Sequence, residues 1–512
     1  MPQVATAATA PAIALLAALL ISAIAAPAHV GNAIKVVARL AIALGVFLLT
    51  VNGVRDERRM RVALAVTSVA GAIVGACALG EYLGLARVLQ FLEQFRDGVH
   101  VVGGQVRASG TLQYPTITSM YLEIVFAFAL GLFVSAIAEE RWIAGGFVLL
   151  GLAAVAEGIT LTFTRAGIIT MGASLVVVGT WRYARHGFDR GVWATCAAAA
   201  VVSGLLLLSW SAESLHLRFT SENRQGWYRA TFDPPADLAF DAGETQFIDV
   251  TVINDGRITW QGSADTPFYA SYHWVDEHTS RVIEYDGIRT PFPSALAPGD
   301  TVTLQMEVRA PVRAGRYRIA WDIVQEHRLW FSTEGGAHTT MTAAAVTGVT
   351  SAKPPVRARG TPASLPVPAR TIGRGTLWVA ALRMLAAHPL MGVGLDNFRL
   401  SYGPYAGVEH ADPRVHTNNV YLEILSGGGL LAGVVLGWLL WRVASTGPAR
   451  WEQLRDTAID PLYSGVAAAA CAILLHGLVD AFLTFTPTYL AFAITLGLLM
   501  APVREEQHAH RI

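Results

Sequence analysis

Two short stretches place arginine where an apolar segment meets a polar one. Arg165 lies in LTFTRAGIITM, between two apolar stretches, and Arg107 lies in RASGTLQYP, just before another. A guanidinium stays charged near neutral pH and can hold a phosphate through two parallel hydrogen bonds. Arg165 is interpreted either as an interfacial arginine that reaches water or as an anion clamp. For Arg107, an ordinary loop charge is the simpler interpretation.

The densest set of polar side chains lies in residues 370–433. TLWVAALRMLAA has helical periodicity and ends at His388, GVGLDNF is a glycine turn, and HTNNVYLEIL opens the next apolar stretch. His416, Asn418 and Asn419 therefore stand at a helix N-terminus. Asparagine is a good cap there, and the same position favours anions.

The other polar side chains within apolar stretches predict no metal site. His476 and Asp480 are four residues apart in HGLVDAF, which predicts a polar pair on one helix face. Glu123 and Glu157 are candidates to pair with the arginines. The three cysteines all lie in apolar runs, which indicates small buried side chains and neither disulfides nor metal ligands.

Membrane helices are the elements predicted to position these residues. The 512-residue chain is 53% hydrophobic and 15% charged, whereas soluble proteins carry about 25% charged residues. Its net charge of zero gives no sign of nucleic-acid binding. A crossing helix needs roughly 20 apolar residues. Ten stretches approach or exceed this length, at about 11–28, 34–52, 62–84, 117–138, 142–163, 166–181, 191–211, 417–441, 461–480 and 486–501.

Arginine clusters predict the orientation of these helices, because loops rich in positive charge stay in the cytoplasm. The clusters follow the second, sixth and eighth stretches and the last one. With ten spans they all fall on one side. Arg165 and His416 then fall on the other, outer side.

A hydrophilic block separates the seventh and eighth apolar stretches. Runs such as TQFIDVTVIND and TVTLQMEVRAP alternate with turns and predict a small antiparallel β-sandwich, immunoglobulin-like. A Pro-rich stretch after it predicts an extended linker. The predicted organisation is a membrane core of about seven spans, a β-sandwich insertion, a linker, an active loop and a core of about three spans, at residues 1–212, 213–350, 351–373, 374–416 and 417–512.

Four stretches, in this order, resemble the O-antigen ligase and polymerase superfamily of bacterial inner-membrane glycosyltransferases. They are RASGTLQYPTITSMYLE, LTFTRAG, GRGTLWVAALRMLAAHPLMGVGLDNF, and HTNNVYLEILSGGGLLAG followed by HGLVDAF. Together they span roughly residues 100–500 apart from the β-rich block.

The resemblance implies a mainly α-helical, polytopic enzyme of the bacterial inner membrane. Such enzymes move a glycan from undecaprenyl diphosphate to an acceptor hydroxyl at the periplasmic face, without a metal or other cofactor. The implied partners are a lipid-linked glycan donor, a glycolipid, glycan or protein acceptor, and membrane lipids. The implied catalytic residues are Arg165, Arg374 and His416, and the implied substrate-binding residues are Arg107, Asn418, Asn419 and Glu423.

The histidine motif departs from the family pattern, which is His, then Asn, Ser or Gln, nine residues, then Gly. Counting back from Gly429 puts Asn418 at the histidine position and His416 two residues early. The alternatives within the class are an O-antigen or exopolysaccharide polymerase and a protein O-oligosaccharyltransferase. A glycolipid transporter is the non-enzymatic alternative, and its polar residues would lie near the middle of the membrane.

Overall fold

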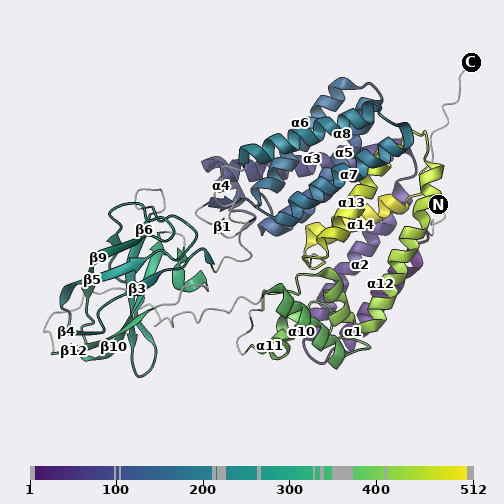
Figure 1. Cartoon of the computed structure of the whole chain (residues 1–512). Helices are drawn as coiled ribbons and strands as arrows, with labels where there is room; N and C mark the ends of the chain where they lie inside the picture. The colour runs from purple at the N-terminus through teal and green to yellow at the C-terminus, as the bar shows by residue number, and fades with distance from the viewer. Residues whose placement is uncertain are drawn as a thin grey trace, which may run out of the picture. The chain divides into compact units, whose positions relative to one another are not determined.

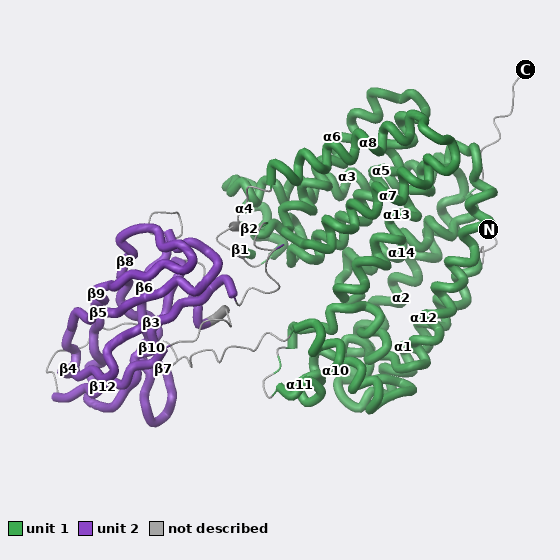
Figure 2. Tube along the Cα trace, in the orientation of Figure 1, with its two compact units in different colours: residues 1–100, 106–215, 372–512 green, residues 101–105, 216–371 purple. Residues whose placement is uncertain are grey.

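The chain forms two compact units, coloured separately in Figure 2. Unit 1 consists of residues 1–100, 106–215 and 372–512, and unit 2 of residues 101–105 and 216–371. Unit 1 is mainly helical, and unit 2 is built from strands (Figure 1). The computed structural model describes residues 6–96, 100–102, 105–209, 215, 219, 226–261, 267–326, 329–334, 340–348, 373–408, 411, 413–481 and 483–503.

Each of the ten predicted apolar stretches contains a helix. These helices are α1 (Thr9–Ile24), α2 (Val30–Gly53), α3 (Glu57–Tyr82), α5 (Pro115–Ala138), α6 (Trp142–Leu161), α7 (Arg165–His186), α8 (Arg190–Ser209), α12 (Val420–Gln453), α13 (Asp460–His476) and α14 (Thr486–Met500). Among the described residues, α2, α3, α5, α6, α8 and α12 are long and apolar enough to cross a membrane, and α1, α13 and α14 are apolar but shorter. The structure is therefore that of a mainly helical, multi-pass membrane protein, while the count of ten crossings stays a prediction.

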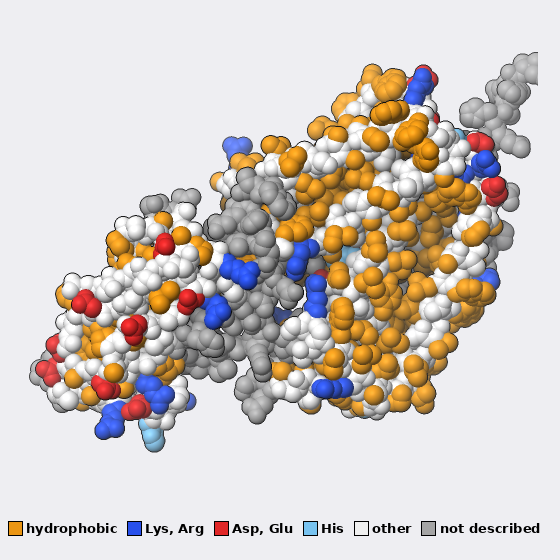
Figure 3. All heavy atoms as spheres, in the orientation of Figure 1, with side chains coloured by type: hydrophobic (Ala, Val, Ile, Leu, Met, Phe, Trp, Pro, Cys, Tyr) orange, Lys and Arg blue, Asp and Glu red, His pale blue; other side chains and the backbone are white. Residues whose placement is uncertain are grey.

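Helix α5 forms the centre of unit 1. Its sequence is apolar on all sides, as expected of a helix buried on every face, and it packs against α3, α6, α7, α8, α13 and α14. The surrounding helices instead turn large apolar side chains outward, such as Leu49 and Phe147, each 73% exposed. Hydrophobic side chains cover most of the visible flank of this unit (Figure 3), as a lipid-facing surface requires.

Two glycines bring α5 and α13 into close contact. A Cβ atom on Gly465 would lie 2.6 Å from the Ala127 carbonyl oxygen and 2.9 Å from the Cα of Gly131. Small residues at helix crossings let backbones approach closely, which is a main source of helix association in membranes. This contact holds α13, which ends at His476, against the central helix.

The arginine clusters after the second, sixth and eighth stretches lie at one end of the helices, whereas the predicted cluster at Arg504 and Arg511 lies outside the described residues. Arg61 bonds Glu139 just beyond the end of α5, and Arg185 lies 3.2 Å from Asp460 at the start of α13. Arg442 reaches the carbonyl of Ala7, just before α1. These contacts join helix ends that the sequence placed on one side, whereas the assignment of that side to the cytoplasm stays a prediction.

Three shorter helices complete the described part of unit 1, and a small two-stranded sheet is divided between the two units. Helix α4 (Ala86–Leu92) follows α3, and α10 (Arg374–Ala387) and α11 (Phe398–Ala406) precede α12. The pair β1 (His100–Val102) and β2 (Gln105–Arg107) lies at the unit boundary. Helix α10 ends just before His388, as its periodicity predicted.

Unit 2 consists of two sheets. One has the strand order β3-β5-β9 and the other the order β4-β12-β10-β6-β7, with β8 and β11 at its margins. The strands are β3 (Thr231–Asp233), β4 (Asp237–Asp241), β5 (Thr245–Ile253), β6 (Phe268–Asp276), β7 (Val282–Glu284), β8 (Thr290–Pro291), β9 (Thr301–Arg309), β10 (Gly315–Gln325), β11 (Leu329–Trp330) and β12 (Met341–Thr347), with the short helix η2 (Phe331–Glu334).

Side chains from both sheets of unit 2 share one buried core. Trp260, Tyr272 and Trp274 are buried in it, whereas Trp330 is half-buried. The immunoglobulin-like character of this unit stays a prediction. The predicted Pro-rich linker lies outside the described residues except for Gly373.

We predict that the contact between α5 and α13 tolerates no side chain. Gly465→Val should destabilise unit 1 by about 1–3 kcal/mol, the usual cost of overpacking, because the new Cβ collides with α5 backbone. Gly437→Val on α12 is the matched control, since nothing lies within 4 Å of that position. Thermal unfolding in detergent measures both variants. Equal midpoints for the two would contradict the packing described here.

Candidate functional site

The predicted site residues lie at the end of the helices opposite the arginine clusters. Arg165 is the first residue of α7, and Arg185 lies in the last turn of the same helix. His416 precedes the first turn of α12, and Arg450 lies in its last turn. In both α7 and α12 the candidate site therefore lies at the N-terminal end, and the arginine clusters lie at the C-terminal end.

Arg107 contacts the turn from which α7 begins. Its Nε donates to the Thr162 carbonyl at 2.9 Å, and its guanidinium reaches the Thr164 hydroxyl at 3.4 Å. Arg165 follows directly, is half-buried, and forms no side-chain hydrogen bond or ion pair with any described residue. The structure thus gives Arg107 a supporting contact with the turn and leaves the charge of Arg165 available.

A buried ion pair holds the segment that follows Arg107. Arg96 lies 2.6 Å from Glu81, and both side chains are almost completely enclosed. The second carboxylate oxygen of Glu81 accepts hydrogen bonds from the backbone N–H groups of Ser109 and Gly110. A carboxylate that is paired with a cation and accepts hydrogen bonds is the arrangement that makes a buried charge tolerable.

Arg374 is the exposed first residue of α10 and interacts electrostatically with His476 at the end of α13. His476 Nδ1 lies 2.8 and 3.0 Å from the carboxylate oxygens of Glu123 on α5. The Thr170 hydroxyl donates to the same carboxylate at 2.6 Å. The predicted pairing of His476 with Asp480 is therefore corrected: the histidine binds Glu123, and Glu123 binds a histidine instead of an arginine.

Arg374 interacts electrostatically with this buried pair, and Arg165 begins the helix that carries Thr170. Thr170 lies five residues after Arg165, which is about 7.5 Å along a helix. Each arginine also begins a helix, where free backbone N–H groups add positive potential. Among the described residues, no hydrogen bond or ion pair joins Arg165, Arg374 and His416 directly.

The glycine turn GVGLDNF is docked into a kink of α12. Gly429 interrupts the helix with φ 66°, and a Cβ there would lie 2.3 Å from the Leu390 carbonyl oxygen. Glycine is needed at this point because a side chain would collide with the docked backbone. Backbone hydrogen bonds from the turn to the kink run from Val393 to Ser426 and from Gly394 to Gly427, and one returns from Leu430 to Pro389.

This docking brings Asp396 to His416. Nδ1 of His416 lies 3.6 Å from Oδ1 of Asp396 and 3.9 Å from Oε1 of Glu423. All three of these atoms are buried and without a hydrogen-bond partner. The Asp396 and Glu423 side chains are 6% and 2% exposed, whereas 15% of the His416 side chain is exposed.

The other oxygen of each carboxylate is held by protein donors. Asp396 Oδ2 accepts from Arg399 at 2.9 Å and from Asn32 at 3.0 Å. Glu423 Oε2 accepts from the backbone N–H and the hydroxyl of Thr417. Each carboxylate is thereby fixed with its free oxygen toward His416.

The surrounding charges raise the pKa of His416 above its ordinary value. Burial on its own lowers this pKa, but the carboxylates of Glu423 and Asp396 outweigh burial and the opposing charge of Arg399. The protonated imidazole is the form that neutralises the two carboxylates. The two carboxylates therefore favour proton uptake by His416.

Asn419 and Asn418 have different local roles. The Asn419 side chain accepts hydrogen bonds from the backbone of Tyr421 and Leu422 and so caps α12, while its amide donates to the Leu478 carbonyl. Asn418 adopts φ 51°, a left-handed conformation that asparagine tolerates better than most residues. The structure thus assigns Asn419 a capping contact, and the predicted roles of both in substrate binding stay predictions.

Sequence reasoning did not single out Asp396. It lies twenty residues before His416, and only the docked glycine turn brings them together. A usable signal was the run of glycines in GVGLDNF and SGGG, because paired glycine-rich segments indicate close backbone approach. By spacing, Asp396, His416 and Glu423 could also hold a metal ion, since one ligand atom from each lies within 4.8 Å of the others.

Comparison with known proteins identifies one domain. Residues 340–437 match the family model described as O-antigen ligase. No curated protein matches the chain. A solved structure of Pseudomonas fluorescens alkylpurine DNA glycosylase AlkC bound to DNA containing an abasic site analog is similar at 10% identity, covering 67% of this chain and 100% of that chain with a TM-score of 0.14. So low a TM-score carries no argument about fold or function.

The matched residues include Arg374, the docked glycine turn, Asp396, His416 and the kink of α12. The four sequence stretches predicted membership of one superfamily, and the matched domain confirms it. This chain therefore carries an O-antigen ligase domain at residues 340–437.

Proposed function

We propose that this protein transfers a glycan from a polyprenyl-diphosphate donor to an acceptor hydroxyl at the periplasmic face of the bacterial inner membrane. One observation carries the proposal: the O-antigen ligase domain includes the buried His416 cluster, which lies at the end of an apolar helical unit opposite its arginine clusters. A lipid-linked substrate would keep its apolar chain in the membrane and present its diphosphate and glycan at that end.

The arginines supply the charge that a departing diphosphate needs. Arg165 has no side-chain partner among the described residues, and Arg374 is exposed. Each stands at the first position of a helix, so guanidinium and helix N-terminus favour the same anion. A positive charge that is already fixed in place stabilises the leaving group in the transition state, because the protein does not have to rearrange during the reaction.

His416 is the proposed general base. Its Nδ1 faces the two carboxylates, and 15% of its side chain is exposed. In the proposed step Nε2 takes the acceptor hydroxyl proton, the oxygen attacks the anomeric carbon, and the bond to the diphosphate oxygen breaks with its electron pair on the diphosphate. A single displacement of this kind inverts the anomeric configuration.

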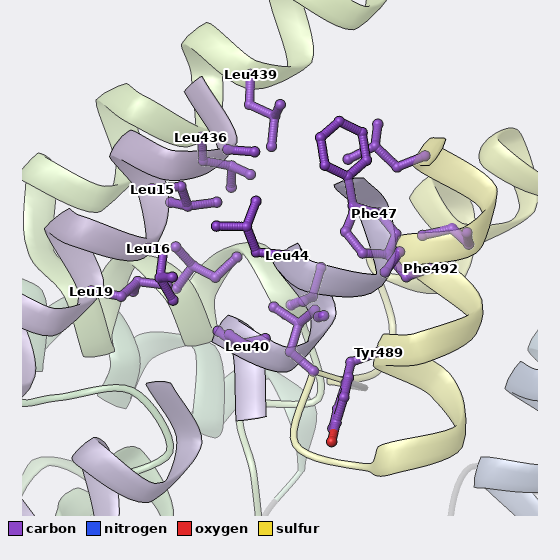
Figure 4. A pocket seen from close by; sticks show the side chains of 18 of the residues that line it. Leu15, Leu16, Leu19, Leu40, Leu44, Phe47, Leu436, Leu439, Tyr489 and Phe492 are labelled. Carbon is purple, nitrogen blue, oxygen red and sulfur yellow. The ribbon is translucent and has the colours of Figure 1, made fainter. Parts of the chain in front are cut away.

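An apolar pocket of unit 1 suits the lipid part of such a donor. Its walls are side chains of α1, α2, α12, α13 and α14, including Leu16, Leu44, Phe47 and Tyr489 (Figure 4). Val420 and Tyr421, which also line it, follow directly on the Asn419 cap. We propose that part of the polyprenyl chain occupies this pocket.

The three enzymatic alternatives differ in the acceptor that receives the glycan. A polymerase would use a second lipid-linked glycan, a ligase a glycolipid, and a protein O-oligosaccharyltransferase a protein hydroxyl. A transporter is the less favoured candidate, because the exposed or unpartnered arginines lie at one helix end, whereas transporter sites lie near the middle of the membrane.

We predict that lysine cannot replace the arginines. Arg165→Lys and Arg374→Lys keep the charge but lose the planar pair of donors, so glycan transfer should fall strongly at both positions. Purified protein in detergent is assayed with a synthetic polyprenyl-diphosphate glycan. Arg87→Lys, at an exposed position of α4, is the control and should keep wild-type transfer. Full activity in both test variants would contradict the proposal that Arg165 and Arg374 hold the diphosphate.

The pocket prediction uses two positions on α2. Leu44→Trp fills the pocket and should raise the KM for a long-chain donor, with a smaller effect for a short-chain analogue. Leu49→Trp places the same indole on the lipid-facing side, where Leu49 is 73% exposed, and should leave both KM values unchanged. If the two variants respond alike to chain length, the lipid chain binds elsewhere.

A further inference from the structure

The free oxygens of Asp396 and Glu423 take no part in the transfer step proposed for His416. Both are buried, both lack a hydrogen-bond partner, and both face the same nitrogen of His416. Leaving a buried acceptor unpaired is costly, and more so when the acceptor is charged. Two such atoms around one imidazole nitrogen indicate that a positive charge or a proton belongs between them.

The arrangement is built from several elements. The Asp396 turn is fixed by backbone hydrogen bonds to the kink of α12 and by Asn397, which binds the Ala28 carbonyl and Asn32 near the start of α2. Glu423 lies in the first turn of α12 and is held by Thr417. The carboxylates therefore stay in place independently of His416.

We propose that Asp396 and Glu423 are positioning residues that together hold the Nδ1 proton of His416 and so leave Nε2 free to accept the acceptor proton. This inference rests on the proposed function. A neutral imidazole carries one proton, and a carboxylate beside one nitrogen keeps that proton there, which makes the other nitrogen the base. Carboxylates that orient a histidine in this way also stabilise the imidazolium formed during the reaction.

The charges around His416 agree with this assignment. The groups that face it are Asp396, Glu423 and, behind Asp396, Arg399. With His416 protonated the four charges sum to zero, so the imidazolium formed when Nε2 takes a proton is the electrically balanced state. The carboxylates thereby favour proton transfer to His416.

Two substitutions test the assignment. Asp396→Asn and Glu423→Gln keep the size of each side chain and remove its charge. Each should lower kcat by at least about tenfold, the double variant by more, and none by more than His416→Ala, whose loss should be ~10²–10⁴-fold. In this proposal the two carboxylates orient His416 and do not bind the acceptor, so KM for the acceptor should change little. Glu423→Asp, which restores the charge, should recover part of the rate.

Chemical modification gives a readout that does not depend on glycan transfer. Diethyl pyrocarbonate reacts with neutral imidazole, and peptide mass spectrometry follows His416 itself. The carboxylates raise the pKa of His416, so both substitutions should shift its modification profile to lower pH, and Glu423→Asp should shift it less. His29, an exposed histidine, is the internal reference, and Glu452→Gln, an exposed carboxylate paired with Arg455, is the control variant.

Each outcome is decisive. Unchanged profiles and unchanged kcat in the double variant would overturn the positioning role. About one equivalent of bound divalent metal in purified wild-type protein, lost in Asp396→Asn, would overturn it in favour of a metal site. If wild-type protein transfers no glycan while the profiles shift as expected, the proposed function fails and the arrangement around His416 stands.

Discussion

The candidate site depends on the backbone hydrogen bonds between the kink of α12 and the preceding glycine turn. Near Gly429 the backbone of α12 is not helical, and backbone groups of residues 426–430 form hydrogen bonds with the turn at residues 389–394 instead. Three successive glycines make this possible because any Cβ there meets docked backbone or a neighbouring side chain within 3 Å. The same exchange fixes Asp396 beside His416, so the chemistry of the site follows from a packing requirement.

Charge in an apolar unit sets the second constraint. Ionisable groups inside a membrane protein are costly unless they are paired. Three buried acids of unit 1, Glu81, Glu123 and Asp460, meet this requirement through Arg96, His476 and the arginines near Asp460. Arg165 and Arg374 differ, since neither has a side-chain partner among the described residues. Unpaired cations at a helix start are the natural place for an anionic substrate to supply the missing charge.

The sequence predicted the helices well because their signal is local. Each apolar stretch contains a helix, and the end of α10 at His388 follows from its own periodicity and the proline after it. The Asn419 cap was likewise expected from its position before an apolar stretch. The O-antigen ligase resemblance rested on several short stretches in a fixed order, and the matched domain covers the third stretch and the first part of the fourth.

The side-chain contacts of the site could not be predicted in the same way. Glu123 and His476 are 353 residues apart, and their pairing depends on how α5 packs against α13. Asp396 meets His416 only through the docked turn. Periodicity gives the face of a helix and says nothing about which distant side chain meets it.

The central claim is that the protein consumes a lipid-linked glycan, and the most direct measurement is mass spectrometry of lipid-linked and surface glycans in a strain lacking it. We expect glycan to accumulate on the polyprenyl carrier in that strain and wild-type protein to reverse the accumulation. Finished chains on the carrier would identify a ligase, and single repeat units a polymerase. Unchanged carrier-linked and surface glycans in the deletion strain would contradict the account.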